Sequence, residues 1–156
     1  MKELVFLLNE LLYTLSAMES CTGGLFASEV TGISGASAVF KGSLVSYTNK
    51  IKEDIGNVSP AIITKFGVVS KETALAMALN AQELFKSDVA VSFTGNAGPH
   101  VLEDKPVGFV CSSIVVKEKT FVYEDYYQGN RNEIRKVIVE QTVRRLLEIL
   151  EEEKNG

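Results

Sequence analysis

Residues 88–94, with the sequence DVAVSFT, place the strongest constraint on the fold of this chain. From Val89 to Phe93 the run is apolar except for Ser92, which is typical of a β-strand with both faces buried. Segments with helical spacing alternate along the chain with segments rich in β-branched and aromatic residues. This alternation favours an α/β domain in which helices cover both faces of a sheet, a three-layer α/β/α sandwich.

The pattern also predicts where each element lies. The predicted helices cover residues 2–12, 25–30, 49–56, a short segment from Pro60, a longer one capped by Ser70, and 131–153. The predicted strands cover residues 13–18, 38–48, 88–94, 107–116 and 119–127. The predicted buried face of the helix after Ser70 consists of Ala74, Met77, Ala78, Ala81, Leu84 and Phe85. Because the last two strands form a hairpin, we expect a mixed, mostly parallel sheet.

Composition excludes several classes of protein. The chain has 156 residues, the length of one domain, and a formal net charge of −4. Its lysines and arginines are scattered and outnumbered, whereas nucleic-acid binders usually carry a basic stripe. Cys21 and Cys111 form neither a disulfide framework nor a zinc motif and suit a reducing compartment. With no bilayer-spanning apolar stretch or signal peptide, the sequence predicts a cytoplasmic protein without nucleic-acid or membrane partners.

Ser20 lies where a predicted strand gives way to a helix, in the run Glu19–Gly24 (ESCTGG). In open α/β sheets, ligands bind beyond the carboxyl ends of strands, and the free N–H groups of a helix start favour negative charge. A serine in this position can form a tetrahedral adduct whose oxyanion faces those donors. Gly23 and Gly24 would let a ligand approach the backbone closely. The same run is also compatible with a simple capping turn.

Cys21 is the alternative nucleophile beside Ser20. A thiolate at a helix start has a lowered pKa and is reactive. Free cysteine is equally typical of buried positions, where it acts as a small apolar residue. Because neighbouring side chains point in different directions, Ser20 and Cys21 cannot both face one substrate atom.

A serine nucleophile needs a base, and the sequence has one histidine, His100. The second loop at a strand end, residues 47–52, offers lysine instead, which becomes a base when burial or neighbours lower its pKa. If a short helix begins near Thr48, Lys52 lies one turn further and can face the strand ends. Tyr47 is then placed to relay or orient the proton. Both lysines of this loop are also compatible with an exposed surface.

The third loop, residues 94–99 (TGNAGP), follows the buried strand. Glycine-bearing turns after such strands often hold anions, but this run lacks the spacing of a P-loop or a dinucleotide fingerprint. Further along, Arg131 or Arg135 in the first turns of the last helix can hold a phosphate by a bidentate contact. No cluster of histidine, aspartate or glutamate has the spacing of metal ligands, so no metal site is predicted.

Together these loops resemble one family, the C-terminal domain of the competence/damage-inducible protein CinA, which also occurs alone as nicotinamide-nucleotide amidase. The resemblance covers nearly the whole chain in the right order, and the run Glu19–Gly24 is its most specific part. The other matching segments are Gly35–Phe40, Tyr47–Asn49 with Lys52, Gly67–Ser70, Thr94–Gly95 with Ala97–Pro99, Lys105–Gly108, and the weaker Gly129 with Arg131.

The resemblance implies a serine amidohydrolase that converts nicotinamide mononucleotide to nicotinic acid mononucleotide and ammonia. The family's serine, tyrosine and lysine map to Ser20, Tyr47 and Lys52. The residues expected to bind the substrate are Cys21, Thr22, Gly23 and Gly24 through backbone N–H groups, Thr94, Gly95 and Gly98 from the third loop, and Arg131. No metal or organic cofactor is implied. The implied partners are a small-molecule nucleotide and further copies of the chain, most simply in a homodimer.

Larger members of the family add an N-terminal nucleotide-pyrophosphatase domain. This chain begins at the first helix of the matching domain, so we expect residues 1–156 to form one domain without pyrophosphatase activity. The chain departs from the family pattern at Asn96, at Phe109, and at 100–104, where a glycine pair is usual. These departures concern the substrate pocket. They favour two alternatives, a non-catalytic nucleotide-binding or regulatory module and an amidase for another amide.

Overall fold

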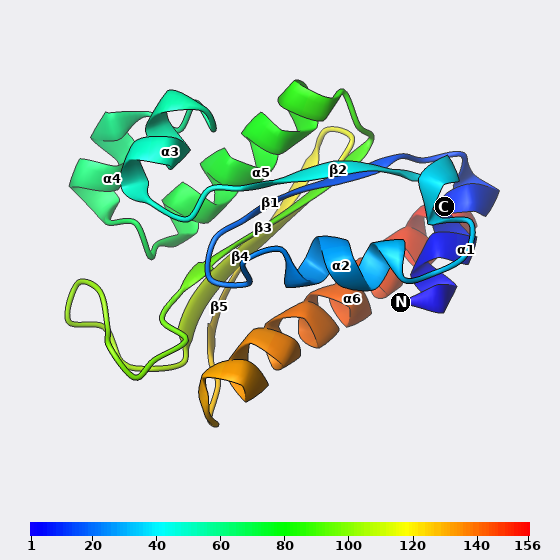
Figure 1. Ribbon diagram of the computed structural model, residues 1–156. Helices are drawn as coiled ribbons and strands as arrows, with labels where there is room; N and C mark the ends of the chain where they lie inside the picture. Colours follow the sequence, from blue (N-terminus) through cyan, green and yellow to red (C-terminus); the bar gives the residue numbers. More distant parts are fainter.

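The structure, a computed structural model, describes residues 1–156 and consists of one five-stranded sheet between two layers of helices (Figure 1). The strands are β1 (Leu15–Glu19), β2 (Phe40–Val45), β3 (Val89–Gly95), β4 (Phe109–Val116) and β5 (Lys119–Tyr126), in the order β2-β1-β3-β4-β5. β1 pairs in parallel with β2 and β3, whereas β4 runs antiparallel to both of its neighbours. The predicted three-layer sandwich with a mixed sheet is therefore confirmed, and β4 is the one reversed strand.

Three helices lie on each side of the sheet (Figure 1). One layer is α1 (Lys2–Leu11), α2 (Leu25–Thr31) and α6 (Arg131–Asn155), and the other is α3 (Asn49–Asp54), α4 (Pro60–Phe66) and α5 (Lys71–Phe85). A short 3-10 helix, η1 (Ala36–Ala38), precedes β2. In β3, Val89, Val91 and Phe93 pack into the core with α1, α2 and α6, whereas Ala90 packs against α5 on the opposite face. Both faces of this strand are buried, as the sequence predicts.

Local sequence accounts for the ends of the helices. Ser70 caps α5, because its hydroxyl accepts a hydrogen bond from the N–H of Thr73 at 3.1 Å. The prediction for one residue of α5 is wrong, since Leu84 is 50% exposed. At about 100° per residue, Leu84 lies roughly 80° around the helix from Ala74, at the edge of the stripe that faces the sheet. Its position in the last turn of α5 leaves it in solvent.

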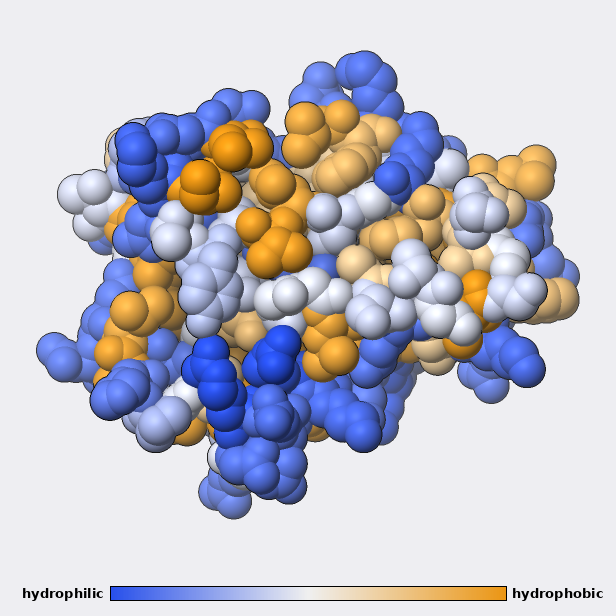
Figure 2. Space-filling model, viewed as in Figure 1, coloured by the Kyte–Doolittle hydropathy of each residue, from blue (hydrophilic) through white to orange (hydrophobic).

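The three parallel strands end side by side, and this arrangement forms the site. β1 is followed by Ser20, β2 by Ser46 and Tyr47, and β3 by Asn96. Because β1 lies between β2 and β3, the three loops meet at one edge of the sheet. The start of α6 lies beneath this edge in Figure 1, where strongly hydrophilic side chains gather in Figure 2. None of the helices combines the length and apolar character that a membrane span needs.

Candidate active site

Ser20 lies directly after β1, and only 8% of its surface is exposed. Helix α2 begins at Leu25, so residues 20–24 form a turn between strand and helix. Gly23 and Gly24 have φ angles of 58° and 101°, in the left-handed region that favours glycine. The conformation of the turn itself therefore explains the glycine pair.

Lys52 projects from the first turns of α3 toward Ser20. Thr48 caps this helix, because its hydroxyl accepts the N–H of Ile51 at 3.3 Å. The Lys52 side chain is 1% exposed, and its Nζ lies 2.9 Å from Ser20 Oγ. Nζ also donates to the backbone carbonyl of Ser46 at 2.7 Å. The structure thus places Lys52 one turn beyond Thr48 and at the strand ends, as the sequence predicts.

Burial lowers the pKa of Lys52 from its ordinary 10.5 to about 8, because the ammonium group loses hydration in the protein interior. At pH 7, roughly a tenth of the molecules then carry a neutral amine that can accept a proton. The Ser46 carbonyl can accept an N–H from either protonation state of the amine. The lone pair of the neutral amine is therefore left to face Ser20.

Cys21 lies in a different environment from Ser20. It is 7% exposed and packs into the main apolar core, and burial raises the pKa of its thiol to about 12. A thiol with so high a pKa is almost wholly protonated at neutral pH and is a poor nucleophile. Of the two candidate nucleophiles, Ser20 is the one whose reactive atom contacts a base.

A cavity of about 310 Å³ opens beside Ser20. Its walls come from the three loops at the strand ends and from the start of α6. The residues that line it are Ser20, Cys21, Tyr47, Thr48, Gly95, Asn96, Ala97, His100, Leu102 and Arg131. The structure therefore brings Ser20, Tyr47, Gly95 and Arg131 around one space, with Lys52 buried behind Ser20.

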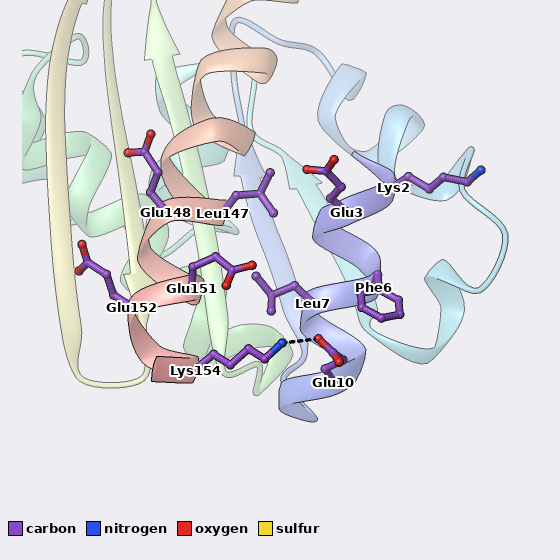
Figure 3. Close-up of a pocket in the computed structure, with 10 residues that line it drawn as sticks. All are labelled: Lys2, Glu3, Phe6, Leu7, Glu10, Leu147, Glu148, Glu151, Glu152 and Lys154. Atoms are coloured by element: carbon purple, nitrogen blue, oxygen red, sulfur yellow. Dashed lines mark hydrogen bonds and ion pairs between the residues drawn. The ribbon is translucent and has the colours of Figure 1, made fainter. Parts of the chain in front are cut away.

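A larger groove, of about 900 Å³, lies between α1 and the C-terminal half of α6 (Figure 3). Leu7 and Leu147 form part of its apolar floor, and Lys154 pairs with Glu10 at 2.9 Å. No group of three or more histidine, cysteine, aspartate or glutamate side chains is arranged to hold a metal ion. The buried serine–lysine pair makes the smaller cavity, rather than this groove, the candidate active site.

Arg131 and Tyr47 contact each other in the wall of the cavity. Arg131 donates from Nη2 to the Tyr47 hydroxyl at 3.0 Å and from Nη1 to the Gly98 carbonyl at 2.6 Å. Tyr47 is 57% exposed, and its hydroxyl makes no hydrogen bond with Ser20 or Lys52. The expected proton relay through Tyr47 therefore lacks a contact, because Lys52 reaches Ser20 directly.

Three of the residues expected to bind the substrate make other contacts within the protein. The Thr94 hydroxyl faces the α5 side of the sheet and donates to a backbone carbonyl of the α4–α5 turn at 2.9 Å. The Thr22 hydroxyl donates to Glu19 Oε1 at 2.8 Å. A Cβ on Gly23 would lie 3.3 Å from the Arg135 guanidinium. The open side of Gly23 is thus filled by an arginine, which corrects the expectation that this glycine makes room for a ligand.

Glu19 has a role that its place in the sequence does not reveal. Its carboxylate is fully buried and accepts the N–H groups of Phe26 at 2.9 Å and Ala27 at 3.2 Å. It also accepts the hydroxyls of Thr22 and Ser43, both at 2.8 Å. A carboxylate at a helix start satisfies free amides and interacts favourably with the helix dipole. The Leu25 N–H donates to the Thr22 carbonyl at 3.0 Å, so the first three amides of α2 all have protein partners and are not donors for an oxyanion.

Comparison with known proteins places the chain in a family, because a family model of the CinA C-terminal domain matches residues 1–150. The chain belongs to the CinA C-terminal domain family. A putative competence-damage inducible protein of Bacillus subtilis is 40% identical over 151 residues, which are 97% of this chain and 36% of the relative. A CinA-like protein of Petrotoga mobilis is 45% identical over 124 residues, 79% of this chain and 31% of the relative. This CinA domain thus spans about a third of the length of these curated relatives.

Solved structures of the CinA superfamily share the fold. The competence/damage inducible protein CihA from Agrobacterium tumefaciens matches with a TM-score of 0.90 and 36% identity, over 96% of this chain and 92% of that chain. A CinA superfamily protein from Enterobacter cloacae matches with a TM-score of 0.91 and 27% identity, over 96% and 91% of the two chains. The agreement extends over nearly the full length of each pair.

Internal hydrogen bonds hold the third loop of this CinA domain in place. Asn96 Nδ2 donates to the carbonyls of Leu102 at 3.2 Å and Lys105 at 3.1 Å, and Asn96 Oδ1 accepts the N–H of Leu102 at 2.9 Å. The Glu103 carboxylate accepts two N–H groups of the α4–α5 turn, both at 2.9 Å. The loop so held brings His100 and Leu102 to the cavity wall.

Proposed function

We propose that this CinA domain is a serine amidohydrolase that hydrolyses nicotinamide mononucleotide to nicotinic acid mononucleotide and ammonia. The observation that carries the proposal is the buried contact of 2.9 Å between Lys52 Nζ and Ser20 Oγ. A nucleophile within hydrogen-bond reach of a base is the arrangement that covalent catalysis requires. The family resemblance suggests the substrate, and a cavity of about 310 Å³ is at the lower end of the range that holds small ligands.

The first half of the proposed reaction forms an acyl-enzyme. Neutral Lys52 takes the proton of the Ser20 hydroxyl while Oγ attacks the carboxamide carbon, and the carbonyl π electrons move to oxygen. The Lys52 ammonium then gives its proton to the amide nitrogen. The C–N bond breaks, ammonia leaves, and the acyl group remains as an ester on Ser20 Oγ.

The second half of the reaction releases the acid. Water attacks the ester carbonyl while Lys52 accepts a proton from the water. Lys52 then returns this proton to Ser20 Oγ as the ester bond breaks, and the carboxylic acid ionises in solution. The same amine acts as base and acid in both halves, so the scheme requires no further titratable group.

Arg131 is proposed to bind the phosphate of the nucleotide. A guanidinium group has five N–H donors, and Gly98 and Tyr47 accept two of those of Arg131. The remaining donors lie in the cavity wall, where the planar fork suits bidentate contact with phosphate. The Arg135 guanidinium is committed to backbone carbonyls of the turn after Ser20. Of the two candidate arginines, Arg131 is the better placed.

Ammonia release tests the proposal. The purified protein, incubated with nicotinamide mononucleotide, should release ammonia and nicotinic acid mononucleotide in equal amounts, followed by a coupled ammonia assay and by chromatography. Nicotinamide riboside, which lacks the phosphate, should react more slowly. Binding of the mononucleotide without ammonia release would contradict the proposal and favour a non-catalytic nucleotide-binding or regulatory module.

An amidase for another amide is the second candidate. It is favoured by His100 and Leu102, which line the cavity in a stretch where the family pattern has a glycine pair. Comparing kcat/KM for nicotinamide mononucleotide, nicotinamide and other small carboxamides decides between the two. A better substrate than the mononucleotide, still dependent on Ser20, would identify this second function.

The rate should rise with pH and level off above about 8, because only the neutral form of Lys52 accepts a proton and its pKa is about 8. Below that value, each pH unit reduces the neutral fraction about tenfold. We expect kcat/KM to show this rise when measured from about pH 7, above the second phosphate pKa of about 6. A flat profile, or one that falls between pH 7 and 8, would contradict Lys52 as the base.

The family resemblance also leads us to propose a cytoplasmic homodimer. Both free cysteines, Cys21 and Cys111, are buried, which is compatible with a reducing compartment. Light scattering behind a sizing column should give twice the 17.0 kDa mass of one chain. The mass of a single chain at the enzyme concentration used for kinetics would contradict the dimer.

A further inference from the structure

The guanidinium group of Arg135, on α6, contacts the backbone immediately after the proposed nucleophile. Its Nε donates to the Cys21 carbonyl at 3.2 Å, and its Nη2 donates to the Thr22 carbonyl at 2.9 Å. The guanidinium forms no ion pair with a carboxylate; its other contact is Asn132 Oδ1, at 3.4 Å from Nη1. A positive charge is thus held against two consecutive peptide groups.

Because of peptide geometry, these contacts also determine the directions in which the neighbouring backbone N–H groups point. A trans peptide is planar, so its C=O and the N–H of the next residue point in opposite directions. By holding the Cys21 carbonyl, Arg135 sets the direction of the Thr22 N–H. The Thr22 carbonyl is held by Arg135 together with the Leu25 N–H, at 3.0 Å, and this sets the Gly23 N–H, which donates to the Ser20 carbonyl at 2.9 Å. That bond in turn fixes the peptide group that carries the Cys21 N–H.

One of the amides fixed in this way borders the cavity. Glu19 accepts the Phe26 and Ala27 amides of α2. The Cys21 amide, by contrast, donates to no backbone carbonyl, and Cys21 lines the cavity beside Ser20, whereas Thr22 is fully buried. The Cys21 N–H is the first amide after the nucleophile. Serine hydrolases commonly hold the oxyanion with the N–H of the residue that follows the serine.

We propose that Arg135 is a positioning residue that fixes the Cys21 N–H as an oxyanion donor for Ser20. This inference rests on the proposed amidase function. The guanidinium also polarises the Thr22–Gly23 peptide group, and the hydrogen bond from Gly23 N–H to the Ser20 carbonyl passes this polarisation to the peptide that carries the Cys21 N–H. Gly23 makes the arrangement possible, because a side chain there would press on the guanidinium, 3.3 Å from its Cβ position.

The test compares Arg135→Met with Arg135→Lys, which can reach one carbonyl instead of two. Arg135→Met should lower kcat for nicotinamide mononucleotide by about 10- to 100-fold and leave KM within about threefold of the wild type. Arg135→Lys should lose less. Pyridine-3-boronic acid is the second probe, because boron forms a tetrahedral adduct with a serine oxygen and presents an oxygen to the oxyanion donors. Its affinity should fall by about the same factor as kcat.

Controls separate this role from others. Arg144→Met makes the same substitution at an exposed site on α6 and should behave as the wild type. Ser20→Ala should abolish boronate binding. A rise in KM with unchanged kcat in Arg135→Met, or a fall in kcat without loss of boronate affinity, would overturn the proposal. If the wild type bound boronate but released no ammonia, the amidase function would be overturned. The boronate affinities of the wild type and the Arg135 variants would then decide the role of Arg135.

Discussion

Ser20→Ala should reduce ammonia release from nicotinamide mononucleotide by a factor on the order of 10³ to 10⁶, the range seen when a serine hydrolase loses its nucleophile. The substitution removes one oxygen atom, at 2.9 Å from Lys52 Nζ, and leaves the rest of the cavity in place. The mononucleotide should therefore bind to the variant within a few fold of its wild-type affinity. The measurements are steady-state ammonia release and a binding titration of the variant.

Cys21→Ala is the matched substitution at the neighbouring position. It removes a thiol that packs in the core and keeps the backbone amide, so we expect an activity loss below about tenfold and a modest loss of stability. Mass spectrometry of the rapidly quenched wild-type reaction should find the acyl group on the peptide that contains Ser20. If Cys21→Ala were inactive and Ser20→Ala active, the nucleophile would be the thiol.

The layered fold could be predicted from local patterns because burial leaves a direct trace in the sequence. In the run from Val89 to Phe93, the apolar residues Val89, Val91 and Phe93 share one face and Ala90 lies on the other, and these faces pack against different helices. Leu84 shows where the pattern stops being informative. It extends the apolar stripe of α5 by about one turn, but a sequence does not record where the sheet beneath a helix ends.

The Ser20–Lys52 contact, the proposed catalytic pair, could also be predicted, because both positions depend on local features. Ser20 follows a strand, and Lys52 lies one turn beyond a capping threonine. The other groups of the candidate site have no comparable local pattern in the sequence. Ser46 acts through its backbone carbonyl, which every residue type has. Arg135 contacts a backbone carbonyl 114 residues away in the chain, a pairing that only the folded structure reveals.

Lys52→Met should abolish activity and raise stability at neutral pH. Methionine has a side chain of similar length and carries no charge, so the variant lacks the proposed base and should lose activity by about 10³-fold or more. In the wild-type protein, burial of the Lys52 ammonium group lowers the free energy of unfolding. The size of this effect follows from the pKa of Lys52, which is about 8 instead of 10.5. At 1.36 kcal/mol per pKa unit this cost is about 3 kcal/mol.

The sign of the pH dependence follows from these two pKa values. Below about pH 8, Lys52 is charged in both the folded and the unfolded chain, and the folded state bears the full cost. Between about 8 and 10.5, the folded state releases its proton first, so the free energy of unfolding of the wild type rises with pH relative to that of the variant. The stability advantage of Lys52→Met should therefore be largest at neutral pH and should shrink toward pH 10.

Thermal unfolding of the two proteins at several pH values measures this difference. At pH 7, we expect Lys52→Met to gain about 1 to 2 kcal/mol, because the loss of hydrogen bonds to Ser46 and Ser20 offsets part of the 3 kcal/mol. For a domain of this size, that gain raises Tm by about 2 to 8 °C. Lys50→Met, on the exposed side of the same helix, should leave Tm and activity nearly unchanged. A variant at Lys52 that is both inactive and less stable at every pH would show that the buried amine stabilises the fold, and that the Ser20–Lys52 contact is structural in origin.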